Sequence, residues 1–226
     1  MGKSKKTWYD NFYKQSDFKH RSEKQEYAYI KMLIKKLRIK EGAKVLDLGC
    51  GTGFYTHILD LAGMDVIGLD YSKEGVYKAN ETFKELEFVI ADANRIPFKY
   101  NTFDLIFVKG LSLFNTSDFS STKPLITSFL GYLTDGEWLI IALGSNLRGE
   151  QKKDSNWFNH RFDSVKQTLL RLDCSSVEIY YTDRILSPVF LGKFALNKFF
   201  TKILLFIALK TKLMGELICV IKKLSR

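Results

Sequence analysis

The chain has 226 residues and a formal net charge of +10 at pH 7, a length that can form one α/β domain with a full core and a modest insertion. An apolar content of 46% argues against a disordered chain, and every apolar run is shorter than the ~18 residues that a membrane-spanning helix needs. The three cysteines form no CxxC pair, so we expect neither a disulfide framework nor a metal site, and a cytoplasmic location fits.

The first predicted element is a helix over residues 22–40. Apolar side chains recur at helical spacing from Tyr27 to Leu37, and lysines fill the opposite face. Gly42 ends the pattern. This helix and the basic residues before it form an N-terminal basic helical segment, residues 1–43.

Strands and helices then alternate along the chain. Strands are predicted over residues 44–48, 65–70, 86–91, 103–109 and 137–144, with helices after the first glycines as far as residue 61 and over residues 73–84 and 122–133. This alternation indicates βαβ units and a parallel sheet, and because the crossovers are right-handed, helices lie on both faces. The tail adds a predicted helix over 161–172 and strands over 176–181 and 217–222.

Three glycines follow the first strand directly. Gly49, Gly51 and Gly53 have the spacing GxGxG, and each lets the backbone turn sharply or approach a ligand, which a Cβ would prevent. Asp47 lies two residues before the first glycine, and Asp70 ends the second strand, where an acid can accept hydrogen bonds from both ribose hydroxyls. The pattern therefore indicates a site for a nucleoside, and it lacks the GxGxxG spacing of a nicotinamide-dependent oxidoreductase.

Four motifs in order carry a family resemblance. They are Val45 to Gly53, Asp70, Ala91-Asp92-Ala93 and Phe103-Asp104-Leu105-Ile106. Together they resemble the motifs of class I S-adenosylmethionine-dependent methyltransferases, most closely the small ubiquinone/menaquinone-biosynthesis-like group. The resemblance implies an α/β fold, a Rossmann-like three-layer sandwich whose seven-stranded sheet is mostly parallel with an antiparallel last strand. It also implies that residues 1–43 are a lid on a methyltransferase domain formed by residues 44–226.

The resemblance assigns a set of cofactor-binding residues for S-adenosylmethionine. They are Asp47, Gly49, Cys50, Gly51, Gly53, Asp70, Tyr71, Asp92, Ala93 and Lys109. Asp47 and the glycine backbone are expected to hold the methionine end, and Asp70 the ribose hydroxyls. Tyr71 is expected to pack on the adenine, and Asp92 to accept a hydrogen bond from the adenine amino group. Two alternatives stay open, namely that Tyr71 is ordinary surface packing and that Asp92 caps the turn after it.

The residues expected to act on the methyl acceptor are Lys109 and His160. Lys109, with Gly110 beside it, is implied by the resemblance to line the methyl-transfer site. Because the sulfonium methyl group is already activated, the protein mainly has to align a nucleophile, and a general base helps only an acceptor that must lose a proton. We favour His160 as that base over His57 and His20; a packing role is the alternative for His160.

Residues 187–214, between the last two strands, are rich in both apolar side chains and lysines. This insertion is interpreted in three ways: as a helical pair packed as a lid, as an interfacial helix on an anionic membrane, or as a dimer contact. Insertions at this place lie near the acceptor pocket in the family. We therefore expect a small or lipid-linked acceptor that is methylated on an oxygen, and a cytoplasmic protein in peripheral contact with a membrane.

Basic residues are in excess at both ends of the chain, in residues 1–43 and 145–226, whereas acidic residues are in excess in residues 44–144. Solvated lysines on helix faces explain this pattern, and so does a basic rim that attracts an anionic substrate, a membrane or nucleic acid. Two further hypotheses follow: an RNA methyltransferase that binds through the basic ends, although no RNA-binding module is recognisable, and a catalytically silent relative that acts as a binding partner. The chain is expected to be a monomer or a homodimer.

Overall fold

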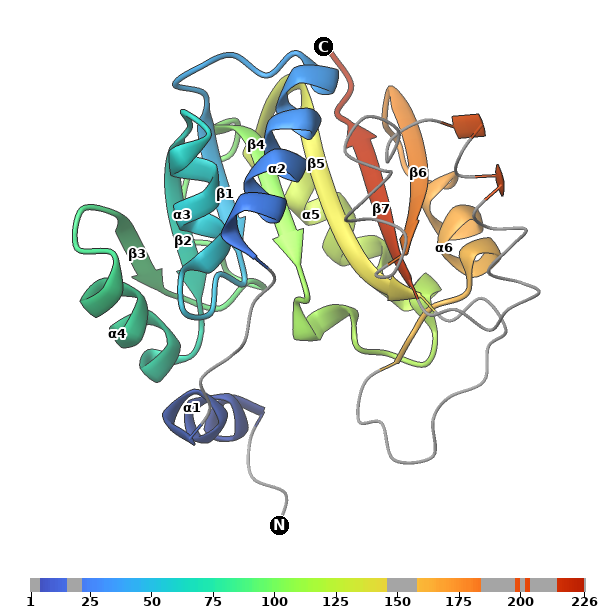
Figure 1. The fold of residues 1–226 in the computed structure, drawn as a ribbon. Helices are drawn as coiled ribbons and strands as arrows, with labels where there is room; N and C mark the ends of the chain where they lie inside the picture. Colours follow the sequence, from blue (N-terminus) through green and yellow to red (C-terminus); the bar gives the residue numbers. More distant parts are fainter. Residues whose placement is uncertain are drawn as a thin grey trace. The chain divides into compact units, whose positions relative to one another are not determined.

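The computed structural model describes residues 5–15, 22–145, 158–183, 198–199, 202–203 and 215–225. Its strands form a seven-stranded sheet in the order β3-β2-β1-β4-β5-β7-β6 (Figure 1). β1, β2 and β3 pair in parallel, whereas β7 is antiparallel to both β5 and β6. The predicted Rossmann-like α/β fold, with a mostly parallel sheet and an antiparallel last strand, is confirmed. The chain divides into two compact units, Met1–Phe107 and Val108–Arg226.

The first unit carries the glycine loop. Its elements are the helices α1 (Lys5–Gln15), α2 (Glu23–Leu37), α3 (Phe54–Leu61) and α4 (Lys73–Thr82), the strands β1 (Lys44–Leu48), β2 (Asp65–Asp70) and β3 (Glu87–Ile90), and most of β4 (Phe103–Lys109). β1 and β2 pair in parallel with Asp47 opposite Gly68 and Leu48 opposite Leu69. Because the pairing is parallel, the carboxyl ends of both strands lie at the same edge of the sheet, where the loop begins.

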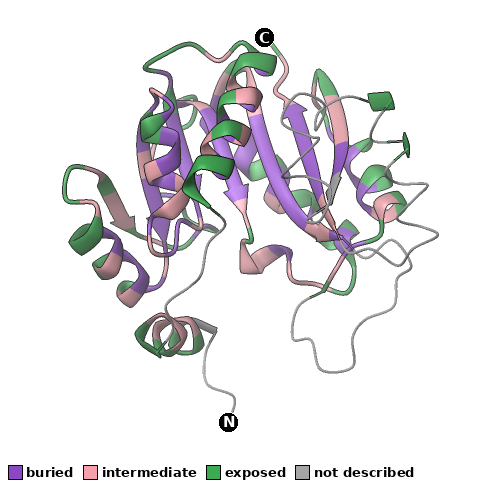
Figure 2. Ribbon diagram, viewed as in Figure 1, coloured by how far each residue is buried: buried purple, intermediate pink, exposed green. Residues whose placement is uncertain are grey.

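The second unit contains the antiparallel strand pairs of the sheet. Its elements are the short 3₁₀ helices η1 (Ser112–Phe114) and η2 (Phe119–Thr122), the helices α5 (Lys123–Tyr132) and α6 (Phe162–Leu169), and the strands β5 (Leu133–Ser145), β6 (Ser176–Asp183) and β7 (Gly215–Lys222). Residues 217–221 of β7 are completely buried, and Figure 2 shows the burial of β5 beside it. This antiparallel pair lies in the core of the second unit.

Three details of the structure differ from the sequence-based expectations. The fifth strand begins at Leu133, four residues earlier than predicted. The prediction began the strand later because Thr134, Asp135 and Gly136 have the composition of a turn; Gly136 has a φ of 78°. The two 3₁₀ helices were not predicted. Nor was α1 predicted as a helix of its own.

The predicted insertion, residues 187–214, lies outside the described residues except at positions 198, 199, 202 and 203, and so does His20. Within the described part of the chain, no helix combines the length and the apolar character that crossing a bilayer requires.

Candidate cofactor site

The glycine loop has a backbone conformation that side chains disfavour. Gly49, Gly51 and Gly53 have φ values of 88°, 55° and 83°, in the left-handed region that glycine enters without strain. The backbone N–H groups of Gly49 and Cys50 donate to the carbonyl of Leu69 at 2.7 and 3.1 Å, which ties the loop to the end of β2. Burial raises the pKa of the Cys50 thiol well above its ordinary value, so Cys50 packs here as a neutral side chain.

Asp70 turns its carboxylate toward this loop. Its Oδ2 accepts a hydrogen bond from the backbone N–H of Gly51 at 3.0 Å, and its Oδ1 accepts one from the backbone N–H of Ser72 at 2.8 Å. Burial raises the pKa of the carboxyl group, and the N–H groups of Ser72 and Gly51 oppose that effect. Because a carboxylate offers about four acceptor positions, Asp70 retains the capacity to accept hydrogen bonds from hydroxyl groups of a ligand.

Asp47 is buried at the end of β1, with 2% of its surface exposed. Its Oδ2 accepts a hydrogen bond from Thr56 Oγ1, in the first turn of α3, at 2.7 Å. Burial raises the pKa of Asp47 to about 7; the hydrogen bond from Thr56 opposes this rise, and the charge of Asp70 adds to it. The sequence did not reveal this hydrogen bond between Asp47 and Thr56. The bond fixes the start of α3 relative to β1.

The segment after β3 lies beside Asp70, since the backbone N–H of Ala91 donates to the carbonyl of Asp70 at 3.0 Å. Asp92 is exposed, and its Oδ1 accepts hydrogen bonds from both the backbone N–H and the side-chain amide of Asn94, each at 2.9 Å. This is the turn-capping arrangement that the sequence left open as an alternative for Asp92. Ala93 is buried.

The helix α1, which sequence reasoning missed, packs on the glycine loop. A Cβ placed on Gly51 would lie 2.6 Å from the hydroxyl oxygen of Tyr13, so the Tyr13 side chain stands directly against the loop. Burial raises the pKa of the Tyr13 hydroxyl, and the charge of Asp70 adds to the rise. The ring of Tyr9 meets that of Tyr71 edge-on, with 5.8 Å between their centroids. Tyr71 therefore packs against α1 in this structure.

The sequence did contain a signal for α1. Trp8 stacks on Phe12 with 5.3 Å between the ring centroids, and Tyr9 lies 6.2 Å from Tyr13. Both pairs have the (i, i+4) spacing at which aromatic side chains meet on a helix. The spacing predicts a helix, but it does not predict where that helix packs.

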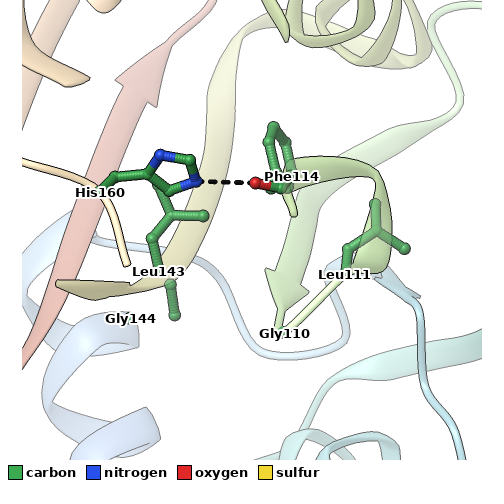
Figure 3. A pocket seen from close by; sticks show the side chains of 7 residues that line it. Gly110, Leu111, Phe114, Leu143, Gly144 and His160 are labelled. Atoms are coloured by element: carbon green, nitrogen blue, oxygen red, sulfur yellow. Dashed lines mark hydrogen bonds between the residues drawn. The ribbon is translucent and has the colours of Figure 1, made fainter. Parts of the chain in front are cut away.

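In the second unit, His160 forms part of the wall of a small pocket (Figure 3). The lining residues are Gly110, Leu111, Phe114, Ala142, Leu143, Gly144 and His160. The cavity volume is about 10 Å³, which is about the room that one water molecule needs. The structure thus brings together His160 and Gly110, two residues that the sequence placed at the acceptor site. A molecule larger than water could enter only if this pocket opened.

The imidazole of His160 is held by a hydrogen bond of 2.7 Å between Nε2 and the carbonyl oxygen of Phe114, which Figure 3 shows as a dashed line. Because a carbonyl can only accept, Nε2 carries the proton and Nδ1 keeps its lone pair. Burial lowers the pKa of His160, and the bond to Phe114 opposes this effect. The ring is therefore neutral at pH 7, as a general base must be.

The backbone of His160 is tied as firmly as its ring. Its N–H donates to the carbonyl of Gly144 at 3.1 Å, and its own carbonyl accepts from Ser145 Oγ at 2.9 Å. The ring also lies 4.8 Å from that of Phe119. His160 thus links the end of β5 to both 3₁₀ helices, a packing role that the sequence kept as the alternative.

Lys109 has a partner that the sequence did not reveal. Its Nζ donates to both carboxylate oxygens of Glu216, on β7, at 2.7 and 2.8 Å. The two side chains are only 14% and 16% exposed, so the charge of Lys109 is neutralised at the end of β4. Glu216 follows Lys109 by 107 residues, a separation at which spacing gives no signal.

The remaining described histidine has a packing contact. His57, in α3, stacks on Phe83 with 4.6 Å between the ring centroids and lies 3.8 Å from Glu23. His57, which the sequence favoured less than His160 as a candidate base, therefore has a packing contact within the first unit.

Residues 39–181 match the family model described as "Methyltransferase domain". Because this match spans more than half of the chain, the chain belongs to the methyltransferase domain family. The match confirms the class predicted from the sequence, that of S-adenosylmethionine-dependent methyltransferases.

Two curated relatives illustrate the range of the family. The chain is 37% identical over 91 residues to "Putative 23S rRNA (guanine-N(1)-)-methyltransferase YxjB" of Bacillus subtilis (strain 168). This match covers 38% of this chain and 31% of the relative. The chain is 34% identical over 101 residues to a demethylmenaquinone methyltransferase of Staphylococcus carnosus (strain TM300), and this match covers 42% of each protein. The chain thus spans less than half the length of these relatives, and the two differ in the acceptor that their names state.

Solved structures share the fold. Phosphoethanolamine N-methyltransferase 2 of Haemonchus contortus, in complex with S-adenosyl-L-methionine, superimposes with a TM-score of 0.67 at 16% identity, over 96% of this chain and 60% of that one. The [4+2]-cyclase SpnF superimposes with a TM-score of 0.60 at 17% identity, over 88% of this chain and 82% of that one. At such identities the likeness shows the fold alone.

Proposed function

We propose that this chain binds S-adenosylmethionine at the glycine loop and Asp70, and transfers its methyl group to a small or lipid-linked acceptor. The observation that carries the proposal is the position of Asp70, whose carboxylate is fixed at the end of β2 by the backbone N–H groups of Gly51 and Ser72. An acid at this place, beside a loop of left-handed glycines, suits a ribose that lies against backbone.

The described residues fit this cofactor. The loop offers left-handed glycines, which lack the Cβ that would hinder a close approach of a ligand to the backbone, and Asp70 offers acceptor capacity for the ribose hydroxyls. Tyr71 would offer an aromatic face to the adenine, and Ala93 would offer it a backbone contact. Asp47, Gly49 and Cys50 complete the part of the loop that would hold the methionine end. For Asp92, the bonds to Asn94 make capping of the turn the role that the geometry supports better.

When bound, the cofactor supplies an activated methyl group, which an acceptor atom takes by in-line displacement. The protein's task is to orient the acceptor and, for a hydroxyl, to receive its proton. We assign the proton to Nδ1 of His160, because Nε2 already donates to Phe114 and the lowered pKa keeps the ring neutral. Lys109, held by Glu216, would line the site as part of a neutral pair.

An oxygen of a small or lipid-linked molecule is the acceptor that we propose. The relatives include proteins named demethylmenaquinone methyltransferase, and the pocket beside His160 is lined mainly by apolar side chains and glycines. Residues 1–43 would act as a lid, and the apolar and basic insertion, residues 187–214, would bring a cytoplasmic monomer or homodimer to an anionic membrane surface.

An RNA acceptor is the second candidate, favoured by the relative that is named for 23S rRNA and by the basic ends of the chain. Binding to RNA through phosphates would weaken steeply with salt, because counterions are released. Binding to a neutral acceptor presented without an anionic membrane, for example in a neutral detergent, would change little. The salt dependence of acceptor binding therefore separates the two candidates.

The test of the proposed function is a transfer screen with S-adenosylmethionine that carries a labelled methyl group. Lipid, glycan and RNA extracts serve as acceptors, and the Gly51→Ala variant serves as the control for background labelling. We expect label in the lipid or small-molecule fraction. Label confined to RNA supports the second candidate, and a chain that binds the donor but labels no fraction supports the catalytically silent relative.

A further inference from the structure

Asp10, on α1, contacts the first turn of α4. Its Oδ1 accepts a hydrogen bond from Ser72 Oγ at 2.6 Å and lies 3.5 Å from the backbone nitrogen of Glu74. A carboxylate is favoured at this end of a helix, because the first N–H groups have no partner within the helix and the helix dipole is positive there. Asp10 therefore holds α1 on α4 by a charge and by hydrogen bonds.

A second contact between the two helices is weaker. Lys14, one turn further along α1, pairs with Glu74 at 3.3 Å, but the two side chains are 58% and 30% exposed. Ion pairs at exposed sites contribute little, because solvent and salt screen them. Of these two polar contacts between α1 and α4, the contact of Asp10 is therefore the stronger.

Ser72, which donates to Asp10, also holds the carboxylate of Asp70. The backbone N–H of Ser72 donates to Asp70 Oδ1 at 2.8 Å, while the hydroxyl of the same residue donates to Asp10. Ser72 is completely buried, and its Oγ also accepts from the backbone N–H of Gly75 at 3.2 Å. Asp10 and Asp70 thus act on one buried serine, so a shift of Asp10 reaches the carboxylate that we assign to the ribose.

The same attachment places two aromatic rings of α1 at the site. A Cβ on Gly51 would lie 2.6 Å from the Tyr13 hydroxyl, and one on Gly75 would lie 3.1 Å from Cδ2 of the same ring. The ring of Tyr9 meets that of Tyr71. α1 therefore reaches Gly51 and Tyr71 directly, and Asp70 through Ser72.

We propose that Asp10 is a positioning residue for donor binding, which holds α1 on α4 and thereby sets Tyr13 against the glycine loop and Ser72 on Asp70. The proposal rests on the proposed function, since it assumes that the donor binds at these residues. Asp10 itself need not touch the donor, because its effect passes through Ser72 and through the position of α1.

Two measurements on the full chain test this proposal. Hydrogen exchange followed by mass spectrometry reports the protection of residues 5–15 without any ligand, and calorimetry reports the affinity for S-adenosylhomocysteine. Both are made on the wild type, on Asp10→Ala and on Asp10→Asn, in which an amide oxygen can still accept the two hydrogen bonds. Asp60→Ala, at an exposed position of α3, is the charge-matched control.

We expect Asp10→Ala to exchange the amides of α1 faster and to bind S-adenosylhomocysteine about tenfold more weakly, the equivalent of about 1.4 kcal/mol. Asp10→Asn should restore most of the protection and most of the affinity, and Asp60→Ala should resemble the wild type in both.

Unchanged exchange in Asp10→Ala overturns the attachment. Faster exchange with unchanged affinity overturns its link to the donor. A wild type that does not bind S-adenosylhomocysteine overturns the proposed function instead, while the exchange data still report on the attachment.

Discussion

Thr56 donates a hydrogen bond of 2.7 Å to Asp47, and both residues are buried in the interior of the first unit. The bond joins the end of β1 to the first turn of α3, so it sets the geometry of the glycine loop between them. It also places a carboxyl group where water cannot solvate its charge. Ionising Asp47 in the interior therefore costs free energy, so the stability of the chain depends on pH.

We predict that Asp47→Asn changes this dependence in a defined direction. Burial raises the pKa of Asp47 from its ordinary value of 3.8 to about 7, so the protonated form is the one that folding favours. The stability gained in this way is complete below pH 4 and is lost as the pH rises through about 7. Relative to Asp47→Asn, which does not titrate, the wild type should lose roughly 2–4 kcal/mol between pH 4 and pH 8. Urea denaturation at a series of pH values measures the difference, and a difference that is constant with pH contradicts the shifted pKa.

Gly51→Ala should abolish donor binding while costing little stability. An alanine at a φ of 55° is strained by about 1 kcal/mol, and its Cβ would displace Tyr13 from the loop. Gly42→Ala is the matched control, because it has a similar φ of 71° and no atom within 4 Å of the added Cβ. Calorimetry with S-adenosylhomocysteine should find binding lost in the first variant and retained in the second. Equal affinities would show that the loop is not the binding surface.

The ion pair between Lys109 and Glu216 predicts a rescue. Lys109→Met leaves a carboxylate with little exposure and no countercharge, so we expect a loss of about 2 kcal/mol, less than a completely buried pair loses. The double variant Lys109→Met, Glu216→Gln should recover most of it, since no uncompensated charge remains. Denaturation in urea gives the three free energies of unfolding. A double variant less stable than Lys109→Met would mean that the two side chains are not coupled.

His160 can be separated into its two roles by choice of substitution. Glutamine can donate a side-chain N–H to the carbonyl of Phe114, as His160 does at 2.7 Å, but it cannot act as a base at neutral pH. If His160 is the base, both His160→Gln and His160→Ala should lower the turnover number with the true acceptor by 10²–10⁴-fold. Full turnover in His160→Gln with a loss in His160→Ala would leave only the packing role. Thermal denaturation of both variants monitors the fold.

Much of the first unit could be predicted from the sequence because its signals are local. The bounds of β1, β2 and β4 follow from short apolar runs, and the glycine loop follows from the GxGxG spacing, which permits the left-handed backbone seen at Gly49, Gly51 and Gly53. The placement of Asp70 beside the loop follows from the parallel pairing of neighbouring strands.

The contacts that could not be predicted join residues distant in the sequence. Nothing in the spacing indicates that Asp10 bonds to Ser72 or that Lys109 pairs with Glu216. Asp92 shows a different limit, because its motif alone is compatible with both a contact to the cofactor and a turn cap, and only the structure reveals the bonds to Asn94.

In the proposed function Asp70 binds the donor, and calorimetry of S-adenosylhomocysteine with Asp70→Asn tests this role most directly. Asp65→Asn is the matched control, since Asp65 begins the same strand and is exposed. We predict that the wild type and Asp65→Asn bind alike, whereas Asp70→Asn binds at least tenfold more weakly, because an amide offers one acceptor oxygen in place of two. Equal affinity of Asp70→Asn and the wild type would contradict the claim.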